Sequence, residues 1–189
     1  MSKMFSRIEP ALRDFILRQH IFFTATATAT SRVNISPRGA DALRVLSENA
    51  IAYLDQTGSG NETAAHLRAD GRMTIMLCAF EAAPTILRLY GRGRTLSRGG
   101  AEYARLLTEA FGGVEPPGAR QIVYLDVDLV QTSCGYGVPM FEYQDERRTL
   151  LNWAERKGEA GLEDYRREKN IRSIDGLDTG VLAANATIV

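Results

Sequence analysis

The chain has 189 residues, with 23 basic and 23 acidic side chains, so its formal net charge is zero. Apolar residues make up 44% of the sequence and charged residues 24%, which is typical of a soluble globular protein. The neutral balance argues against a protein that coats nucleic acid, and the longest apolar run, residues 73–80, is too short for a membrane helix.

Residue counts also bear on the cellular environment and on ligands. Cys78 and Cys134 form no Cys-x-x-Cys pair, and two cysteines with two histidines favour neither a disulfide framework nor a zinc site. The N-terminus carries charges where a signal peptide needs an apolar stretch, so we expect a cytoplasmic protein without a metal. Of the 23 basic residues, 20 are arginines, which favours phosphate or carboxylate ligands unless it reflects only the composition of the genome.

The first part of the chain predicts one helix followed by short strands. The helix is expected over about residues 7–18, where apolar side chains recur at helical spacing. Strands are expected at residues 24–30, where Thr and Ala alternate between the two faces, and at residues 32–36. Residues 40–46 are expected to form a short helix, and residues 50–55 a third strand.

The rest of the chain continues with alternating elements. The expected strands are 72–80, 85–96 and 121–131, and the expected helices are 62–69, 101–111 and a C-terminal helical region at about 143–170. Residues 132–139 contain two glycines and a proline and are expected to be irregular. Because the connections between residues 32 and 80 are too short for repeated βαβ crossovers, we expect one domain over residues 1–189, a small barrel with peripheral helices.

The first candidate ligand site is the glycine-containing turn at residues 57–63, which leads into the helix expected at 62–69. A helix N-terminus presents free N–H groups and partial positive charge, and glycines let the backbone approach an anion closely. The turn could therefore bind phosphate. Ser59 and Glu62 also match a capping box, which needs no ligand, and the lysine of a nucleotide-binding P-loop is missing.

The second candidate is a polar row on the strand at 32–36. Arg32, Asn34 and Ser36 point to the same side of an extended strand. Such a row is either a solvent-exposed face or a set of hydrogen-bonding groups for the edge of a heterocycle or for a phosphate.

Two further candidates lie in the second half of the chain. Cys134 stands in a glycine-flanked segment, but without a histidine nearby we expect a turn at an interface rather than a catalytic thiolate. Trp153 is expected to be a core or interface residue, with contact to a ligand ring as the alternative.

Four segments occur in a distinctive order: Phe22-Phe23 with Ala25-Thr26-Ala27, then RVNISPRG at 32–39, YLDQTGSGNET at 53–63 and RLYGRG at 88–93. Together they resemble the pyridoxamine 5′-phosphate oxidase family of FMN-binding split barrels, over roughly residues 15–177. The segments at 131–139 and 170–177 are similar to a branch of mostly uncharacterised bacterial members. The resemblance implies a six-stranded antiparallel split barrel and a homodimer that binds FMN at the subunit interface.

The resemblance also implies roles for individual residues. The flavin ring and ribityl chain would contact the strand at 32–36, and the phosphate would contact the turn at 57–63. The cofactor-binding residues carried over are Arg32, Val33, Asn34, Ser36, Arg38, Thr57, Gly60, Asn61, Thr63 and Arg88, with Gln131, Ser133 and Trp153 from the second subunit. The alanines of the strand at 24–30 are expected to face the barrel interior.

The implied activity is that of an FMN-dependent oxidoreductase acting on an unidentified small molecule. No catalytic residue is assigned. The family's C-terminal Arg-x-His motif is absent, because both histidines lie at positions 20 and 66, and this argues against oxidation of pyridoxamine phosphate. The usual Ser-Arg-Lys run at the phosphate turn is replaced by Asn61-Glu62-Thr63, so Glu62 must point away from a bound phosphate.

Two alternatives keep the fold and change the ligand. A deazaflavin coenzyme with a longer anionic tail would need additional basic residues, which Arg92 and Arg94 could supply. A non-catalytic protein that stores flavin or binds haem is the other alternative, with His66 as the only plausible axial ligand.

Overall fold

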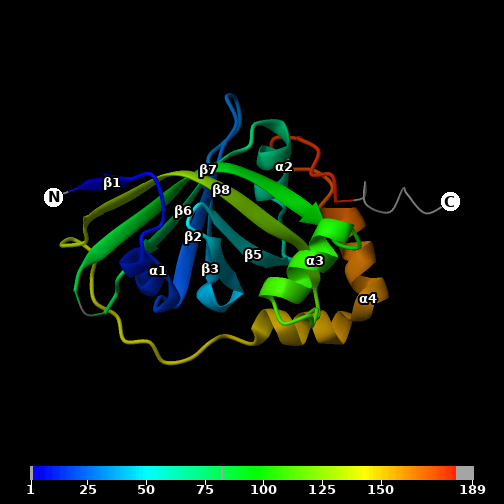
Figure 1. Ribbon diagram of the computed structural model, residues 1–189. Helices are drawn as coiled ribbons and strands as arrows, with labels where there is room; N and C mark the ends of the chain where they lie inside the picture. Colours follow the sequence, from blue (N-terminus) through cyan, green and yellow to red (C-terminus); the bar gives the residue numbers. More distant parts are fainter. Residues whose placement is uncertain (1, 82, 182–189) are drawn as a thin grey trace.

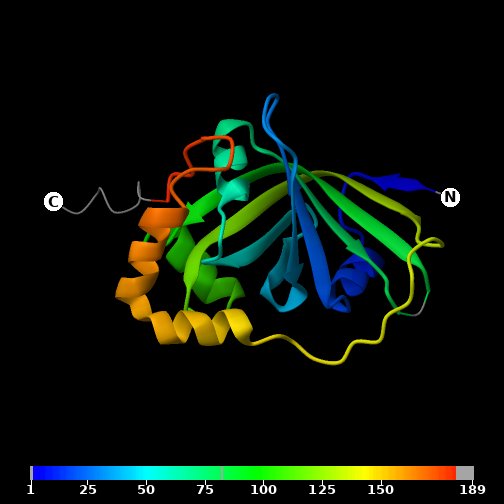
Figure 2. The same ribbon diagram turned by 180° about the vertical axis from the view of Figure 1, so that it is seen from behind.

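The computed structural model of the protein describes residues 2–81 and 83–181. Its centre is one curled antiparallel sheet (Figures 1 and 2) with the strand order β3-β2-β6-β7-β8-β5-β4, in which β1 also pairs with β8. The strands are β1 (Lys3–Phe5), β2 (Ile21–Thr26), β3 (Asn34–Gly39), β4 (Leu43–Ser47), β5 (Ala50–Gln56), β6 (Arg72–Cys78), β7 (Thr85–Ser97) and β8 (Ala119–Cys134).

The described residues also form four α-helices around this sheet. They are α1 (Pro10–Leu17), α2 (Glu62–Ala69), α3 (Ala101–Ala110) and α4 (Thr149–Lys169). Helix α4 is kinked at Gly158, whose φ is 65°, and runs beside α3 (Figure 1). The mainly-β barrel with peripheral helices is therefore confirmed. Helix α1 lies within the expected range 7–18, and α4 begins at Thr149 rather than near residue 143. In the described part of the chain, no helix is long and apolar enough to span a membrane.

The described sheet has eight strands rather than six. Each of the six expected strands is present, and β1 and β4 are additional. The helix expected at 40–46 is wrong: only a 3₁₀ turn, Ala40–Ala42, precedes β4. Leu43 pairs with Tyr53, and Val45 with Ile51, so a hairpin with β5 buries this segment and overrides its local preference.

Strand β2 differs from its expected position and orientation. It ends at Thr26 instead of Thr30, and its inward residues are Phe22, Thr24 and Thr26, while Ala25 lies on the outer face. Phe22 is fully buried against the ring of Tyr53, with ring centroids 5.3 Å apart. Because side chains alternate along a strand, a buried Phe22 fixes both threonines inside. The prediction that the alanines face the interior is therefore wrong.

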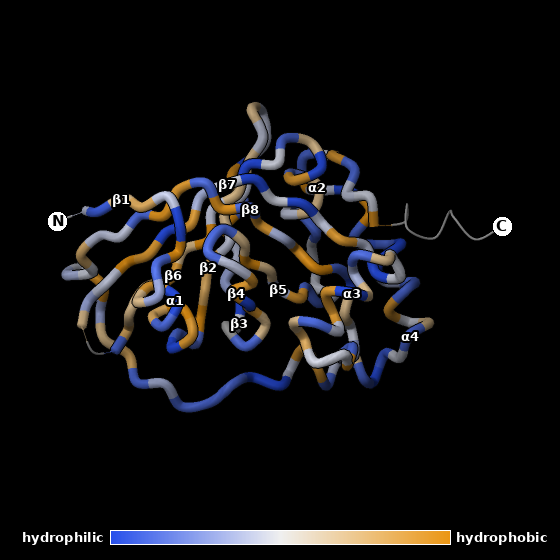
Figure 3. Tube along the Cα trace, in the orientation of Figure 1, coloured by the Kyte–Doolittle hydropathy of each residue, from blue (hydrophilic) through white to orange (hydrophobic). Residues whose placement is uncertain are grey.

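The sheet separates two apolar clusters. The larger one lies inside the curl, where Phe15 and Ile16 of α1 and Leu67 of α2 pack against the inner faces of the strands. The smaller one lies outside, where Tyr103 and Leu106 of α3 cover Ile122 of β8 and its neighbours. The hydrophilic connection from β8 to α4 runs along the open side of the sheet (Figure 3).

Strand β8 is the longest element of the sheet and pairs with β1, β5 and β7. It continues to Cys134, where residues 132–134 were expected to be irregular, because Thr132 and Cys134 pair with Leu87 and Thr85 of β7. The half of the outer face formed by β3, β2, β6 and the adjoining ends of β7 and β8 carries no described helix (Figures 1 and 2). Val33 and Ile35 are 68% and 65% exposed there.

Candidate phosphate and cofactor site

The turn between β5 and α2 is held from one side through its carbonyl groups. Asn170 Nδ2 donates to the Gly58 carbonyl at 3.0 Å, and Arg120 Nη1 donates to the Gly60 carbonyl at 3.0 Å. In a trans peptide the N–H of the next residue points opposite to the carbonyl, and the described chain has no cis peptide bond. The N–H groups of Ser59 and Asn61 therefore point away from Asn170 and Arg120.

The start of α2 is a cluster of unpaired backbone donors. None of the N–H groups of residues 59–64 donates to another group within the described chain. Unpaired N–H groups and the helix dipole together attract an anion. This part of the predicted phosphate site therefore fits an anionic group.

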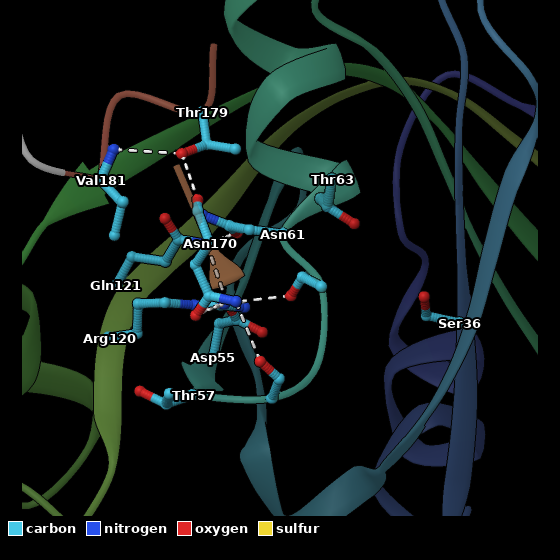
Figure 4. A network of polar contacts seen from close by, with 12 residues as sticks. Ser36, Asp55, Thr57, Asn61, Thr63, Arg120, Gln121, Asn170, Thr179 and Val181 are labelled. Atoms are coloured by element: carbon cyan, nitrogen blue, oxygen red, sulfur yellow. Dashed lines mark hydrogen bonds and ion pairs between the residues drawn. The ribbon is translucent and has the colours of Figure 1, made fainter. Parts of the chain in front are cut away.

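The polar row of β3 meets this turn through side chains. Asn34 Nδ2 donates to Thr63 Oγ1 at 3.2 Å and to Thr26 Oγ1 at 3.3 Å, and Ser36 Oγ donates to Asn34 Oδ1 at 3.3 Å. Figure 4 shows Thr63 on the side of α2 that faces the strand carrying Ser36. The two sequence segments predicted to share a ligand therefore lie together.

A buried hydroxyl lies under the same region. Tyr53 is fully buried, and its hydroxyl has no hydrogen-bond partner among the described residues. Burial raises the pKa of Tyr53 to about 12, although nearby Arg38, Thr63 and Thr24 act in the opposite direction. The hydroxyl thus stays protonated at neutral pH and remains available as a donor.

A buried ionic network supports the turn from below. Arg120 contacts Asp55 Oδ2 through Nε at 3.1 Å and Nη2 at 2.7 Å, and Arg38 Nη1 contacts Asp55 Oδ1 at 2.5 Å. Gln121 Nε2 joins Asp55 Oδ2 to Asn61 Oδ1, both at 2.8 Å (Figure 4). Burial alone would raise the pKa of Asp55, but Arg120 and Arg38 lower it below its ordinary value. The carboxylate is therefore fully charged and over-neutralised by two guanidinium groups.

The C-terminal segment after α4 lies against the start of α2. Asp175 accepts a hydrogen bond from the Arg32 backbone N–H at 2.8 Å and forms an ion pair with its guanidinium. The Glu62 carboxylate accepts from the Ile174 backbone N–H at 3.0 and 3.2 Å. Glu62 is thus bound to the C-terminal segment, while its Oε1 lies 3.8 Å from the position that a Cβ at Gly60 would take.

The capping box is wrong in its details. The N-cap of α2 is Asn61, and no side chain caps the helix. Ser59 lies outside the helix, and Glu62 is bound to Ile174 instead of to Ser59. The carboxylate of Glu62 instead accepts a hydrogen bond from the segment at 171–176, which is far away in the sequence.

Other predicted residues do not join this cluster within one chain. Thr57 is buried between the Gly118 carbonyl and Arg166 Nε, at 2.9 and 2.8 Å. Arg88 contacts Ser133 Oγ at 3.1 Å, and Trp153 packs edge-on against Tyr165 of its own helix, with centroids 5.1 Å apart. Thr57 therefore supports the fold, and Trp153 does not reach the turn.

Sequence reasoning missed several groups around the site. They are Tyr53, Arg120, Gln121, Asn170 and Asp175. Tyr53, Asn170 and Asp175 stand inside segments that carry the family resemblance, so the signal was present without a role attached to it. Arg120 and Gln121 have no local pattern that marks them, because their partners lie 60 or more positions away in the sequence.

Comparison with known proteins identifies the family to which this sequence is similar. Residues 8–134 match the family model described as pyridoxamine 5′-phosphate oxidase. The pyridoxamine 5′-phosphate oxidase family protein ustO of Aspergillus flavus is 37% identical, over 94% of this chain and 77% of that protein.

Solved structures show the same fold at low sequence identity. HupZ of Group A Streptococcus superposes with a TM-score of 0.55 and 20% identity, over 67% of this chain and 99% of HupZ. A candidate pyridoxamine 5′-phosphate oxidase of Lactobacillus delbrueckii subsp. gives a TM-score of 0.51 and 16% identity, over 67% of this chain and 94% of that chain. The curled antiparallel sheet is thus shared with members of this group.

Proposed function

Because this chain belongs to the pyridoxamine 5′-phosphate oxidase family, we propose that it is a homodimeric flavoprotein that binds FMN and acts as an oxidoreductase on a small molecule. The observation that carries the proposal is the set of unpaired N–H groups at residues 59–64, which meets Asn34 and Thr63 at one place. That donor set suits the phosphate monoester at the end of FMN.

The charges around the turn also suit a phosphate. Glu62 is turned towards Ile174, and the charge of Asp55 is exceeded by those of Arg38 and Arg120. Tyr53 offers a protonated hydroxyl close to Thr63 and Thr24. The proposed phosphate contacts are Asn61, Thr63 and the backbone of Gly60, with Asn34 and Ser36 directing the ribityl chain. Arg32 joins them once its ion pair with Asp175 opens.

The second subunit is assigned to the outer face. A groove of about 380 Å³ lies there, and its lining residues include Ala25, Ala27, Gly91, Val33 and Tyr90. Small side chains there leave room for a second copy of the chain. The exposed Val33 and Ile35 would be covered in a dimer, as contiguous apolar surface usually is.

Residues of the same outer face would complete the pocket from the second subunit. Tyr90 Oη donates to Gln131 Oε1 at 3.0 Å. Ser133 lies two residues further along β8 on the same face, where it contacts Arg88. These groups lie on the face that a second copy would contact. Trp153 is the least supported member of the predicted set, because it packs on its own helix.

FMN supplies hydride or electron transfer when it is bound. The chain itself supplies binding, orientation and hydrogen bonds, and no general acid or base is assigned. Oxidation of pyridoxamine phosphate is not part of the proposal, because the segment that would carry an Arg-x-His motif has no histidine. The substrate is instead expected over the open face of the flavin near the dimer interface.

The two alternative ligands are less well supported. Arg92 donates to the Asp70 carbonyl at 2.6 Å, and Arg94 is paired with Glu102 and Asp126, so both would have to leave these partners to bind the tail of a deazaflavin. His66 is buried, and its Nδ1 lies 3.1 Å from Thr26 Oγ1. Haem ligation would require that helix α2 move.

A binding titration tests the proposal directly. We expect purified protein to bind FMN at one molecule per chain and to sediment as a dimer of the 20.8 kDa chain. Thr63→Val should weaken FMN binding about tenfold through loss of a phosphate donor, whereas Thr108→Val on the exposed face of α3 should not. A colourless protein that does not bind added FMN, or a monomer that binds FMN, would refute the proposal.

A further inference from the structure

The phosphate turn owes its orientation to two side chains that lie behind it. Asn170 Nδ2 and Arg120 Nη1 each take one carbonyl of the turn, those of Gly58 and Gly60. The same Nη1 also donates to Asn170 Oδ1 at 2.8 Å, so the two supporting side chains are tied to each other (Figure 4). Each bond fixes one peptide plane and with it the direction of the following N–H.

Among the described residues, no other hydrogen bond is made to the carbonyl groups of Gly58 and Gly60. Both carbonyls belong to glycines, which adopt positive and negative φ with similar ease. A Cβ at Gly58 would meet nothing within 4 Å, and at Gly60 only the flexible side chain of Glu62. Steric contacts therefore leave both orientations open, and the hydrogen bonds from behind select one of them.

We propose that Asn170 and Arg120 are positioning residues that aim the Ser59 and Asn61 N–H groups at the phosphate of the bound cofactor. The inference rests on the proposed function and adds how this chain recognises the phosphate. The buried, partnerless hydroxyl of Tyr53 is a second indication that a ligand belongs beside this turn. Asn170 and Arg120 touch the turn and not the ligand.

Both positioning residues are themselves rigidly held. Asn170 is fully buried, its N–H donates to the Arg166 carbonyl at 2.9 Å, and its own carbonyl accepts from Thr179 Oγ1 at 2.6 Å. Arg120 is 3% exposed and is oriented by Asp55. A ligand-binding turn supported in this way is organised before the ligand arrives, which lowers the cost of binding.

Riboflavin provides the distinguishing measurement, because it carries the ring and ribityl chain of FMN without the phosphate. We expect Asn170→Leu to reduce the preference for FMN over riboflavin about tenfold or more, as loss of donors to a charged group does. Leucine adds no charge, so the loss cannot come from repulsion. A purely structural defect would weaken the binding of both flavins equally.

Asn49→Leu is the matched control, because Asn49 Nδ2 also donates to backbone carbonyls, those of Ser6 and Val127 at 2.8 and 3.0 Å, at the opposite end of β5 from the turn. Its FMN-to-riboflavin ratio should equal that of the unmodified protein. If Asn170→Leu fails to fold, Arg120→Lys makes the same test, since lysine keeps a charge beside Asp55 but cannot hold both acceptors.

The outcomes separate the inference from the function on which it rests. An unmodified protein that prefers FMN, together with folded variants that keep the full preference, overturns the positioning role alone. An unmodified protein that binds FMN and riboflavin equally overturns the phosphate site itself, and the inference with it.

Discussion

Asp175 holds Arg32 at both its backbone and its side chain. One carboxylate oxygen accepts the Arg32 N–H at 2.8 Å, and the other forms an ion pair with the guanidinium. The Arg32 side chain is nevertheless 73% exposed. The guanidinium nearest to the start of β3 is thus neutralised by a carboxylate from the C-terminal segment, 143 positions away.

Asp175→Asn should strengthen FMN binding several-fold. The substitution removes a negative charge beside the proposed phosphate site and frees Arg32 to bind the phosphate. Thermal stability should change little, because asparagine can still accept the Arg32 N–H and the Arg32 guanidinium is largely exposed to solvent. Fluorescence titration measures the affinity, and Asp178→Asn, which affects the exposed pair with Arg68, is the control. Weaker FMN binding in Asp175→Asn would mean that the carboxylate positions Arg32 productively.

Asp55→Asn should destabilise the protein by about 3–5 kcal/mol, because it leaves the buried guanidinium of Arg120 without its counter-ion. Denaturant unfolding measures the loss. The exposed Asp126, which pairs with Arg94, provides the control substitution Asp126→Asn, and its effect should be within about 1 kcal/mol.

The same carboxylate sets part of the acid sensitivity. The two guanidinium groups outweigh burial and hold the folded-state pKa of Asp55 below its ordinary 3.8. Its contribution to stability is therefore complete above about pH 4 and is lost as the pH falls through the lower folded-state pKa. Asp55→Asn should flatten this acid limb in pH-dependent unfolding. An equally steep limb in the variant would assign the acid sensitivity to other carboxylates.

Tyr53→Phe should leave the free energy of unfolding unchanged or raise it, because the hydroxyl is buried without a partner. It should weaken FMN binding. Tyr103→Phe is the contrasting variant: Tyr103 Oη donates to Glu115 Oε1 at 2.5 Å, so its loss should cost about 1 kcal/mol and leave FMN binding intact. A clear loss of stability in Tyr53→Phe would show that the hydroxyl is already bonded.

The sequence predicts the strands well where apolar periodicity is strong. All six expected strands exist. Strands β5, β6, β7 and β8 each bury two or more apolar side chains in the core inside the curl, whereas β3 buries none there. The prediction fails at β2, where Thr and Ala alternate and neither type identifies the buried face. Phe22 decides that face through its contact with Tyr53, a packing relationship that the local pattern does not contain.

Within the candidate site, the local motifs can be predicted from the sequence, but the distant residues that hold them in position cannot. The meeting of Asn34 with Thr63 follows from two recognisable segments. The bonds from Asn170 and Arg120 to the turn span 112 and 60 positions. Such contacts depend on the residue at which α4 ends and on the register between β5 and β8. Neither can be predicted from a local sequence pattern.

The two ends of strand β8 have different roles in the proposed pocket. One end supports the turn, and the other carries side chains on the outer face. Arg120 and Gln121 hold the turn of their own chain, whereas Gln131 and Ser133 lie about 33 Å further along. One chain therefore cannot place both ends in a single pocket, but two copies can. The variants Asn170→Leu and Gln131→Ala should each bind FMN poorly alone. When the two are refolded together, each mixed dimer should contain one intact pocket, so about a quarter of all pockets should bind FMN normally. Two damaged alleles of the gene would then complement each other in one cell.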